Sequence, residues 1–301
     1  GYQQTSLYVM DIDGKNVKKV SGDFDRNIGN INWKGDSKGL FFQYDDKGMT
    51  KMASISLSGK VKDIVDELGG LSTGRPYSGG TYSISRGGRY AFTYGNVYNP
   101  SDLATGYNGS KNRITQLNKD LFEYKKLGKV EEVWYNSSYD GRKIQGWLVT
   151  PPDFDPSKKY PLILEIHGGP FSNYGFRFSA EVQLFASKGY AVLYTNPRGS
   201  TSYGKEFANL IHHNYPSEDY DDLMSGIDHI LKREYIDENN LFVTGGSGGG
   251  VLTSWIVGKT NRFNAAVVAK PVINWYSFVL YADNISYFYR YWFTGLPWDN
   301  V

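Results

Sequence analysis

The stretch LFVTGGSGGGVLTSWIVG, from Leu241 to Gly258, decides how this chain is interpreted. Its centre, GGSGGG, has the composition of a flexible linker that takes no fixed shape. The flanks differ, because LFVT is typical of a short buried strand and VLTSWIVG of a helix. A linker has no place between a strand and a helix of one domain, whereas a sharp turn does. We therefore interpret GGSGGG as a turn that requires glycine.

Within this turn, residues 245–249 match the pattern G-x-S-x-G of a nucleophile elbow. The turn is expected to project Ser247 so that its hydroxyl stands clear of the sheet. A side chain at Gly245 or Gly249 would collide with neighbouring backbone, which explains the spacing of the glycines. Gly248 then supplies the N–H that follows the nucleophile, a donor to an oxyanion. The remaining alternative is the flexible linker.

From Lys129 onward, apolar strands alternate with amphipathic helices, a pattern that predicts an α/β fold with a mainly parallel, doubly wound sheet. Two strands, VEEVWYNS and KIQGWLVTP, are joined by a turn at Asp140-Gly141. Ser217 is expected as a helix N-cap, followed by apolar residues at helical spacing. The expected buried strands are YPLILEI, YAVLYTN, LFVT and AAVVA in chain order. The first expected helix is AEVQLFAS, between the first two of these strands.

A second glycine motif supports the elbow. HGGP, at His167–Pro170, directly follows the buried strand that ends at Ile166. In α/β-hydrolases a loop of this type offers a second oxyanion N–H, and its glycines let the backbone approach the substrate oxygen. One such donor contributes about 2.7–4 kcal/mol of transition-state stabilisation. An ordinary turn at a strand end is the alternative.

Residues 1–128 follow a different pattern, of short strands broken by turns. SLYVMDIDGK is loosely repeated as KMASISLSGK 45 positions later, and INWKGDSKGLFFQY as YSISRGGRYAFTYG about 50 positions later. A period of this size is typical of β-propeller blades, of which two to three are present where a closed propeller needs about four. The alternative is an irregular β-sandwich. Residues Asn96–Asn112 are polar and Gly-rich, and are expected to form a long inter-strand loop.

Composition excludes several classes of function. The 301 residues carry a net charge of +2 without a basic run, which disfavours nucleic acid as a partner. There is no Cys, so disulfides, thiolate metal sites and a Cys nucleophile are excluded. No apolar run is long enough to cross a membrane. His212-His213 lacks the spacing of a metal site and is expected at a solvated helix end, and no metal is expected. Arg198 is expected to brace its loop by pairing with a carboxylate, and His229 to be exposed.

These motifs resemble the prolyl oligopeptidase family of serine peptidases, in its acylaminoacyl-peptidase and dipeptidyl-peptidase 5-like branch. The resemblance rests on EIHGGP, NPRGSTSYGKEF (Asn196–Phe207), EDYDDL (Glu218–Leu223), VTGGSGGG and the segment Val251–Trp275. It implies part of a β-propeller over residues 1–128, followed by the N-terminal part of an α/β-hydrolase peptidase domain over residues 129–301. It further implies cleavage of short peptides through an acyl-enzyme, without metal or cofactor.

By this resemblance, Ser247 is the nucleophile, and Gly248 and Gly169 form the oxyanion hole. The aromatic stretch Val272–Tyr291 falls where the family builds the wall of its S1 pocket, and Trp275 and Phe288 are the candidates there. Their alternative is plain core packing.

The resemblance also exposes a gap. In this fold the triad follows the chain order Ser, Asp, His, yet all four histidines precede Ser247. Serine needs a base to take its proton. We therefore expect both domains to be truncated, with the triad Asp and His beyond Val301.

Two alternative functions stay open: an esterase of small acyl esters, and a catalytically silent propeller-hydrolase protein that binds partners. A homo-oligomer also stays open, as does the compartment, periplasm or cytoplasm. Both peptidase types, acylaminoacyl and dipeptidyl, stay open as well.

Overall fold

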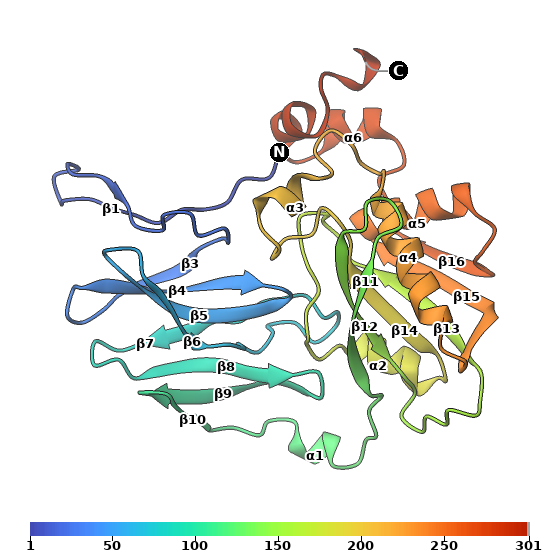
Figure 1. The fold of residues 1–301 in the computed structure, drawn as a ribbon, viewed down its shortest axis with the longest axis horizontal. Helices are drawn as coiled ribbons and strands as arrows, with labels where there is room; N and C mark the ends of the chain where they lie inside the picture. The colour runs from blue at the N-terminus through green and yellow to red at the C-terminus, as the bar shows by residue number, and fades with distance from the viewer. Residues whose placement is uncertain (300–301) are drawn as a thin grey trace.

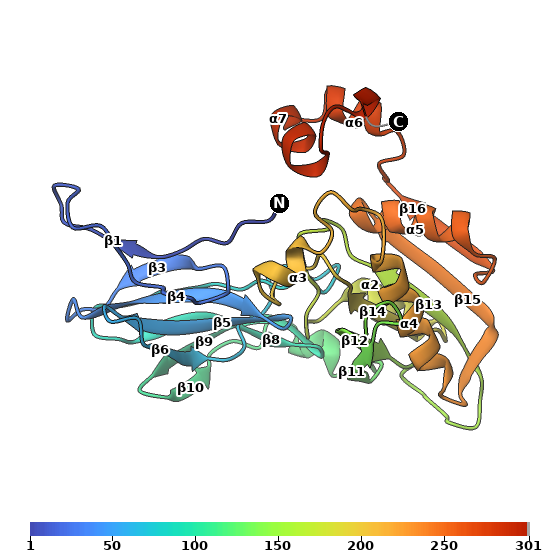
Figure 2. The ribbon, with the colours of Figure 1, turned by 45° about the horizontal axis from the view of Figure 1, so that its top comes forward.

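The computed structural model describes residues 1–299, apart from the side chains of Ser286 and Tyr291. Two parts lie side by side (Figure 1): a set of antiparallel β-sheets formed by the first third of the chain, and a six-stranded sheet with helices on both faces formed by the remainder. Figure 2 shows the same arrangement tilted, with the last helices projecting above the sheet. None of the helices described is long and apolar enough to cross a membrane.

The N-terminal part contains two four-stranded antiparallel sheets and a two-stranded ribbon. The ribbon pairs β1 (Tyr8–Val9) with β2 (Lys18–Lys19). The first sheet consists of β3 (Gly29–Trp33), β4 (Gly39–Asp46), β5 (Met49–Ser56) and β6 (Val61–Val65). The second consists of β7 (Tyr82–Ile84), β8 (Tyr90–Asn96), β9 (Asn99–Tyr107) and β10 (Ser110–Arg113). One of the two predicted repeats is confirmed, because β3-β4 and β7-β8 are the strand pairs of the INWKGDSKGLFFQY and YSISRGGRYAFTYG units. The other is not, because SLYVMDIDGK contributes β1 to the ribbon and KMASISLSGK contributes β5 to the first sheet.

The two sheets share a hydrophobic core. Met52 and Val65 of the first sheet pack with Tyr82, Tyr90 and Phe92 of the second, and all five are buried. Burial of side chains of this size stabilises the fold by about 1.5–3 kcal/mol each. The sheets therefore stack in sequence order.

The predicted loop at Asn96–Asn112 is wrong, because this segment forms the hairpin β9-β10. Buried and more exposed residues alternate along β9, but its buried positions hold small or paired polar residues where large apolar ones would be expected. Asp102 is buried and accepts from Thr115 Oγ at 2.8 Å while pairing with Arg113. Gly106 lies against the Tyr90 ring, 2.3 Å from where a Cβ would stand. A strand that buries Asp and Gly shows no hydrophobic period, and the sequence pattern missed it for this reason.

The C-terminal sheet has the order β11-β12-β14-β13-β15-β16. β11 and β12 are antiparallel and the four strands from β14 to β16 are parallel, as predicted for a mainly parallel sheet. The strands are β11 (Val130–Asn136), β12 (Lys143–Val149), β13 (Tyr160–Ile166), β14 (Ala191–Asn196), β15 (Ile236–Gly246) and β16 (Ala265–Ala269). The helices are α1 (Lys119–Phe122), α2 (Ala180–Ser187), α3 (Lys205–Asn209), α4 (Asp219–Leu231), α5 (Gly248–Lys259), α6 (Trp275–Tyr281) and α7 (Ile285–Tyr287).

Each face of this sheet has its own core, which is the packing of a doubly wound fold. Leu162 and Leu164 of β13 point to the face covered by α4 and α5, whereas Ile163 points to the face covered by α2. Because side chains alternate along a strand, a strand covered on both faces is apolar throughout. The continuous apolar run of β13 therefore indicates that it is a central strand of the sheet, covered on both faces.

The predicted start of α4 is displaced by one residue. The N-cap position is Glu218 and not Ser217, and the Glu218 side chain makes no capping hydrogen bond. Instead, the buried carboxylate of Asp219 accepts from the N–H groups of Ser217, at 2.8 Å, and of Tyr220, at 3.0 Å. Ser217 Oγ donates to the carbonyl of Asn214 at 2.6 Å.

Candidate active site

Ser247 occupies a sharp turn between β15, which ends at Gly246, and α5, which begins at Gly248. Its backbone has φ 59° and ψ −118°, a combination that is costly for a residue with a Cβ. Its side chain is exposed, although the glycines on both sides are buried. The turn is held by hydrogen bonds from Ser247 N–H to Ala269 O and from Val251 N–H to Ser247 O, both 3.0 Å. This is the strand-turn-helix geometry expected of a nucleophile elbow.

The glycines of the elbow are required by close backbone contacts. A Cβ on Gly245 would stand 2.5 Å from the carbonyl oxygen of Gly249. A Cβ on Gly249 would stand 2.1 Å from the carbonyl oxygen of Ile166, at the end of β13. Neither carbonyl can move freely, because each belongs to a strand or a helix. The elbow therefore packs directly against the strand that carries HGGP.

The HGGP turn lies next to Ser247. A Cβ on Gly168 would stand 3.3 Å from Ser247 Cβ, and a Cβ on Gly248 would stand 3.0 Å from Gly169 N. Gly169 has φ 130°, in the region that favours glycine. Among residues 1–299, the N–H groups of Gly169 and Gly248 have no hydrogen-bond acceptor. Two adjacent unpaired donors beside an exposed hydroxyl form a site for a developing oxyanion. The structure thus brings together Ser247, Gly248 and Gly169.

His167 is buried and is not placed to serve Ser247 as a base. Its Nδ1 donates to the carbonyl of Gly168 at 2.8 Å, and its Nε2 lies 2.8 Å from Ser200 Oγ. Burial lowers the pKa of His167 to about 4, so the ring is neutral. Both ring nitrogens are occupied, and the ring serves to hold the glycine turn.

The other histidines lie elsewhere. His212 and His213 are exposed beyond α3 with their rings 3.8 Å apart, which agrees with the prediction of a solvated position. His229, expected to be exposed, is half-buried with its ring stacked on Tyr135 at 5.8 Å, because α4 packs against β11. In the described part of the chain, no histidine or carboxylate is hydrogen-bonded to Ser247 Oγ, and no cluster of three or more His, Asp or Glu is arranged for a metal ion.

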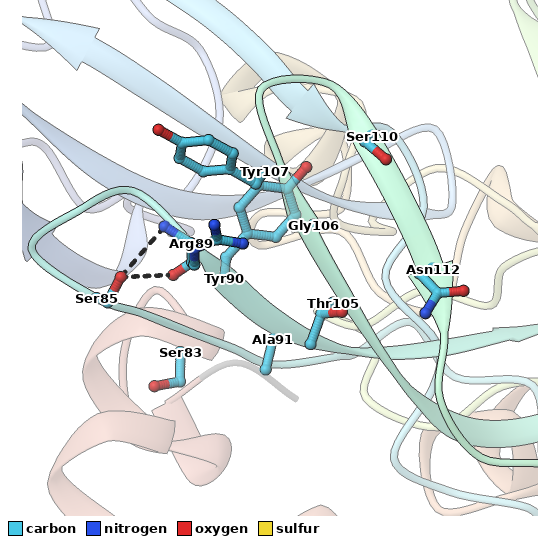
Figure 3. A pocket seen from close by; sticks show the side chains of 10 residues that line it. All are labelled: Ser83, Ser85, Arg89, Tyr90, Ala91, Thr105, Gly106, Tyr107, Ser110 and Asn112. Atoms are coloured by element: carbon cyan, nitrogen blue, oxygen red, sulfur yellow. Dashed lines mark hydrogen bonds between the residues drawn. The ribbon is translucent and has the colours of Figure 1, made fainter.

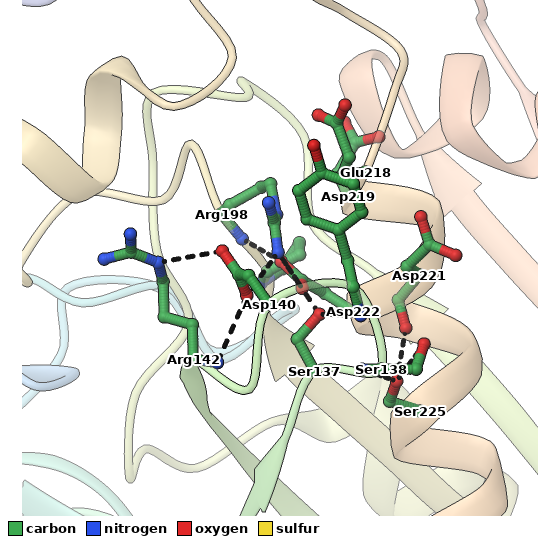
Figure 4. A network of polar contacts seen from close by, with 12 residues as sticks. Ser137, Ser138, Asp140, Arg142, Arg198, Glu218, Asp219, Asp221, Asp222 and Ser225 are labelled. Carbon is green, nitrogen blue, oxygen red and sulfur yellow. Dashed lines mark hydrogen bonds and ion pairs between the residues drawn. The ribbon is translucent and has the colours of Figure 1, made fainter.

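Arg198 braces the loop that carries Ser200, as predicted, and Figure 4 shows its contacts. Its Nε lies 3.0 Å from Asp222 Oδ2 and its second terminal nitrogen 2.8 Å from Asp222 Oδ1. The same nitrogen lies 3.2 Å from Asp140 Oδ1. Since Arg198 and Asp222 are both buried, removing either would leave an unpaired buried charge. The pair therefore fixes Ser200, which in turn contacts His167.

Asp219 is a buried carboxyl beside this network. Its Oδ1 accepts two backbone N–H groups, while its Oδ2 has no partner among the residues described. Burial raises the pKa of Asp219 from 3.8 to about 7, against the effect of those hydrogen bonds. Burial also raises the pKa of Glu165 to about 7.

Because the pKa values of Asp219 and Glu165 are raised in the folded protein, we predict that it becomes less stable as the pH rises from about 4 to about 8. A folded-state pKa above the unfolded value means that the folded protein holds a proton that the unfolded chain has released. The stabilisation that the protonated Asp219 carboxyl gives the folded state is complete below its unfolded pKa of 3.8, and it is lost as the pH passes 7. Asp219→Asn should reduce the difference in urea midpoint between pH 5 and pH 8. The exposed control Asp283→Asn should leave it unchanged, and an equal difference in both variants would contradict the prediction.

The candidate pocket residues lie in one aromatic cluster. The Trp275 ring, at the start of α6, is 5.8 Å from that of Phe278, and the Phe288 ring is 4.3 Å from the same partner. The ring of Trp292 lies 6.5 Å from that of Phe288 and 5.3 Å from that of Tyr215, and so joins the cluster to the elbow. Tyr215 donates its hydroxyl to Gly248 O at 2.9 Å. Sequence reasoning missed this link, because nothing in the local pattern around Tyr215 marks it.

The comparison with protein families assigns the chain. A sequence model described as the prolyl oligopeptidase family matches residues 176–301, and a relative named as a peptidase is 38% identical over 86% of this chain. The chain belongs to the prolyl oligopeptidase family. The match includes the elbow, the Arg198 loop and α4, and begins after the HGGP turn.

Relatives in the prolyl oligopeptidase family share most of this chain. It is 38% identical over 265 residues to the "Uncharacterized peptidase YuxL" of Bacillus subtilis, a match that covers 86% of this chain and 38% of that protein. It is 31% identical over 273 residues to dipeptidyl-peptidase 5 of Aspergillus fumigatus, covering 87% of this chain and 37% of that one. The chain thus spans about two-fifths of the length of these relatives.

A solved structure has the same fold. An acylaminoacyl peptidase in complex with Z-Gly-Gly-Phe-chloromethyl ketone superposes with a TM-score of 0.86 at 24% identity, over 99% of this chain and 45% of that protein. Both the β-sheets and the α/β sheet therefore belong to a fold that is already seen in that acylaminoacyl peptidase.

Proposed function

We propose that the full-length protein is a serine peptidase that hydrolyses short peptides through an acyl-enzyme on Ser247. The observation that carries the proposal is the unpaired pair of N–H groups, of Gly169 and Gly248, beside the exposed hydroxyl of Ser247. Ser247 Oγ attacks the peptide carbonyl, the carbonyl oxygen becomes an oxyanion bound by the two N–H groups, and the amine leaves. Water then hydrolyses the ester.

The general base is proposed to be a histidine outside residues 1–301, oriented by an Asp that also lies outside them. His167 cannot take this role, because both of its ring nitrogens are occupied and its pKa is about 4. A serine hydroxyl without a base is a poor nucleophile, so activity requires the complete protein.

The names of the relatives support a peptidase of the dipeptidyl or acylaminoacyl type. An esterase and a silent binding protein are the alternatives. Comparing the turnover of a peptide p-nitroanilide with that of the matching p-nitrophenyl ester distinguishes peptidase from esterase, and a silent protein would turn over neither.

We also propose that residues 1–128 are part of a β-propeller and residues 129–301 part of a peptidase domain. Two consecutive four-stranded sheets stacked in sequence order support this assignment. Figure 3 shows that β7–β10 also line a hollow, bordered by small side chains such as Ser83, Ala91 and Thr105. Such a surface fits the packing of a further blade.

Active-site labelling tests the proposal. A fluorophosphonate should react once per full-length protein, and peptide mapping should find the label on Ser247. Modification of any other serine, or no modification of folded protein, would contradict the assignment.

For the side chain before the scissile bond, we expect a preference for Phe and Leu over Ala, and poor cleavage after Lys or Arg. A pocket walled by Trp275 and Phe288 is proposed to bind this side chain, and each buried methylene there contributes about 0.8 kcal/mol. The inhibitor bound to the acylaminoacyl peptidase carries Phe at the corresponding end. The measurement is kcat/KM on peptides that differ only at this position.

Two alanine variants on α6 separate the pocket from the surface. Trp275→Ala should lower kcat/KM for the Phe substrate more than for the Ala substrate. Tyr281→Ala, on an 87% exposed residue of the same helix, should change neither. A preference for Arg or Lys, or an equal effect of Trp275→Ala on both substrates, would refute this pocket.

A further inference from the structure

A segment of the N-terminal part is built into the candidate active site. Residues 71–80, between β6 and β7 and here called the strap, leave the β-sheets and lie along the α/β part. Four backbone hydrogen bonds of 2.7–3.1 Å fix them there: Ala180 N–H to Thr73 O, Glu181 N–H to Gly74 O, Gly175 N–H to Pro76 O and Ser78 N–H to Asn173 O. The strap is therefore docked as part of the α/β structure.

Arg75 anchors the strap electrostatically. Its guanidinium makes two hydrogen bonds to Glu181, of 2.9 and 3.0 Å, and lies 3.3 Å from the buried carboxylate of Glu165. One terminal nitrogen lies 3.0 Å from where a Cβ on Gly246 would stand. Bidentate pairing of this kind adds directional specificity to the contact. The anchor thus lies beside the elbow.

Tyr77 carries the strap into the HGGP turn. Its ring packs against Tyr174, with centroids 4.8 Å apart, and its hydroxyl oxygen accepts the N–H of Gly168 at 2.8 Å. A Cβ built on Gly168 would stand 3.2 Å from this hydroxyl oxygen and 3.3 Å from Ser247 Cβ, so both groups border the same position. A residue of the N-terminal part therefore lies at the candidate nucleophile.

The two peptide units of the turn are held separately. Tyr77 binds the N–H of the peptide between His167 and Gly168. His167 Nδ1 binds the carbonyl of the next peptide, whose N–H belongs to Gly169. Glycine peptides rotate readily because no Cβ restricts them. Two such anchors keep the Gly169 N–H directed to one place, and preorganised donors are the effective ones in oxyanion stabilisation.

We propose that Tyr77 is a positioning residue, whose hydroxyl holds the Gly168 peptide so that the Gly169 N–H faces the oxyanion formed at Ser247. The proposal rests on the serine-peptidase function proposed above. It makes the N-terminal part a contributor to the chemical step.

The test is Tyr77→Phe in the full-length protein, which removes the hydroxyl and keeps the ring contact with Tyr174. We expect kcat per titrated active site to fall about 3- to 10-fold, the value of one neutral hydrogen bond, with KM unchanged. Tyr82→Phe is the matched control, because it removes a hydroxyl bonded to Asn30 O within the β-sheets, and it should leave kcat unchanged.

The outcomes separate the two proposals. Absence of fluorophosphonate labelling at Ser247 in the unmodified protein rejects the peptidase function itself. With labelling intact, unchanged kcat in Tyr77→Phe overturns the role of Tyr77. The same holds for a rise in KM alone, for a Phe variant that does not fold, and for an equal loss of kcat in Tyr82→Phe.

Discussion

Ser247→Ala in the full-length protein is expected to abolish both fluorophosphonate labelling and peptide hydrolysis. This is the largest expected effect on activity. The substitution removes only the hydroxyl that would form the acyl-enzyme. In a well-studied serine peptidase the equivalent change costs about 10⁶-fold in kcat. Labelling is read by mass and hydrolysis by release of a chromogenic amine.

The control for this variant is Ser254, two turns further along the chain in helix α5. Ser254 is half-buried, and its Oγ donates to Gly250 O at 2.9 Å. Ser254→Ala removes one hydroxyl from α5 without touching the turn, so it should keep full labelling and turnover. Turnover by Ser247→Ala within tenfold of the unmodified protein would reject Ser247 as the nucleophile.

Gly249→Ala has the largest expected effect on stability. The new Cβ would stand 2.1 Å from Ile166 O and 2.8 Å from His167 O, distances that require backbone to move. These carbonyls belong to the central strand β13 and the turn after it, so relief costs the packing of elbow against strand. We expect a loss of more than about 4 kcal/mol or no folded protein, beyond the usual range for a single substitution.

Gly258→Ala is the matched glycine variant. It lies in the same helix, and apart from the backbone of that helix no atom of residues 1–299 stands within 4 Å of its Cβ position. Ala is the better helix former, so this change should be neutral or stabilising by up to about 1 kcal/mol. Urea unfolding of both variants checks the prediction. Equal stability of Gly249→Ala and Gly258→Ala would refute the close contact between the elbow and Ile166.

Local patterns predicted the elements of the site well. The strand LFVT, the turn around Ser247 and the helix after it appear as predicted, because apolar periodicity and a cluster of glycines are properties of a few neighbouring residues. The glycine turn HGGP after β13 was predicted for the same reason. The roles of Ser247, Gly248 and Gly169 in catalysis remain proposals.

Where burial did not follow hydrophobicity, prediction failed. The strand β9 buries Asp102 and Gly106, so Asn96–Asn112 was taken for a loop. His229 packs on Tyr135 because of where α4 lies on the sheet. In both cases the decisive partner lies elsewhere in the fold, and a local pattern contains no record of it.

Short-range patterns are enough to predict the strand-turn-helix around Ser247, the glycine turn after β13 and the alternation that builds a mainly parallel sheet, since each depends on neighbouring residues. The positions of Tyr77 at the glycine turn and of Arg75 beside the elbow, by contrast, follow only from the way the two parts of the chain pack together. Their partners are 91 and 106 positions away in the chain. Contacts at such separation depend on how whole sheets dock, and docking is set by the sum of many buried surfaces that no short pattern encodes.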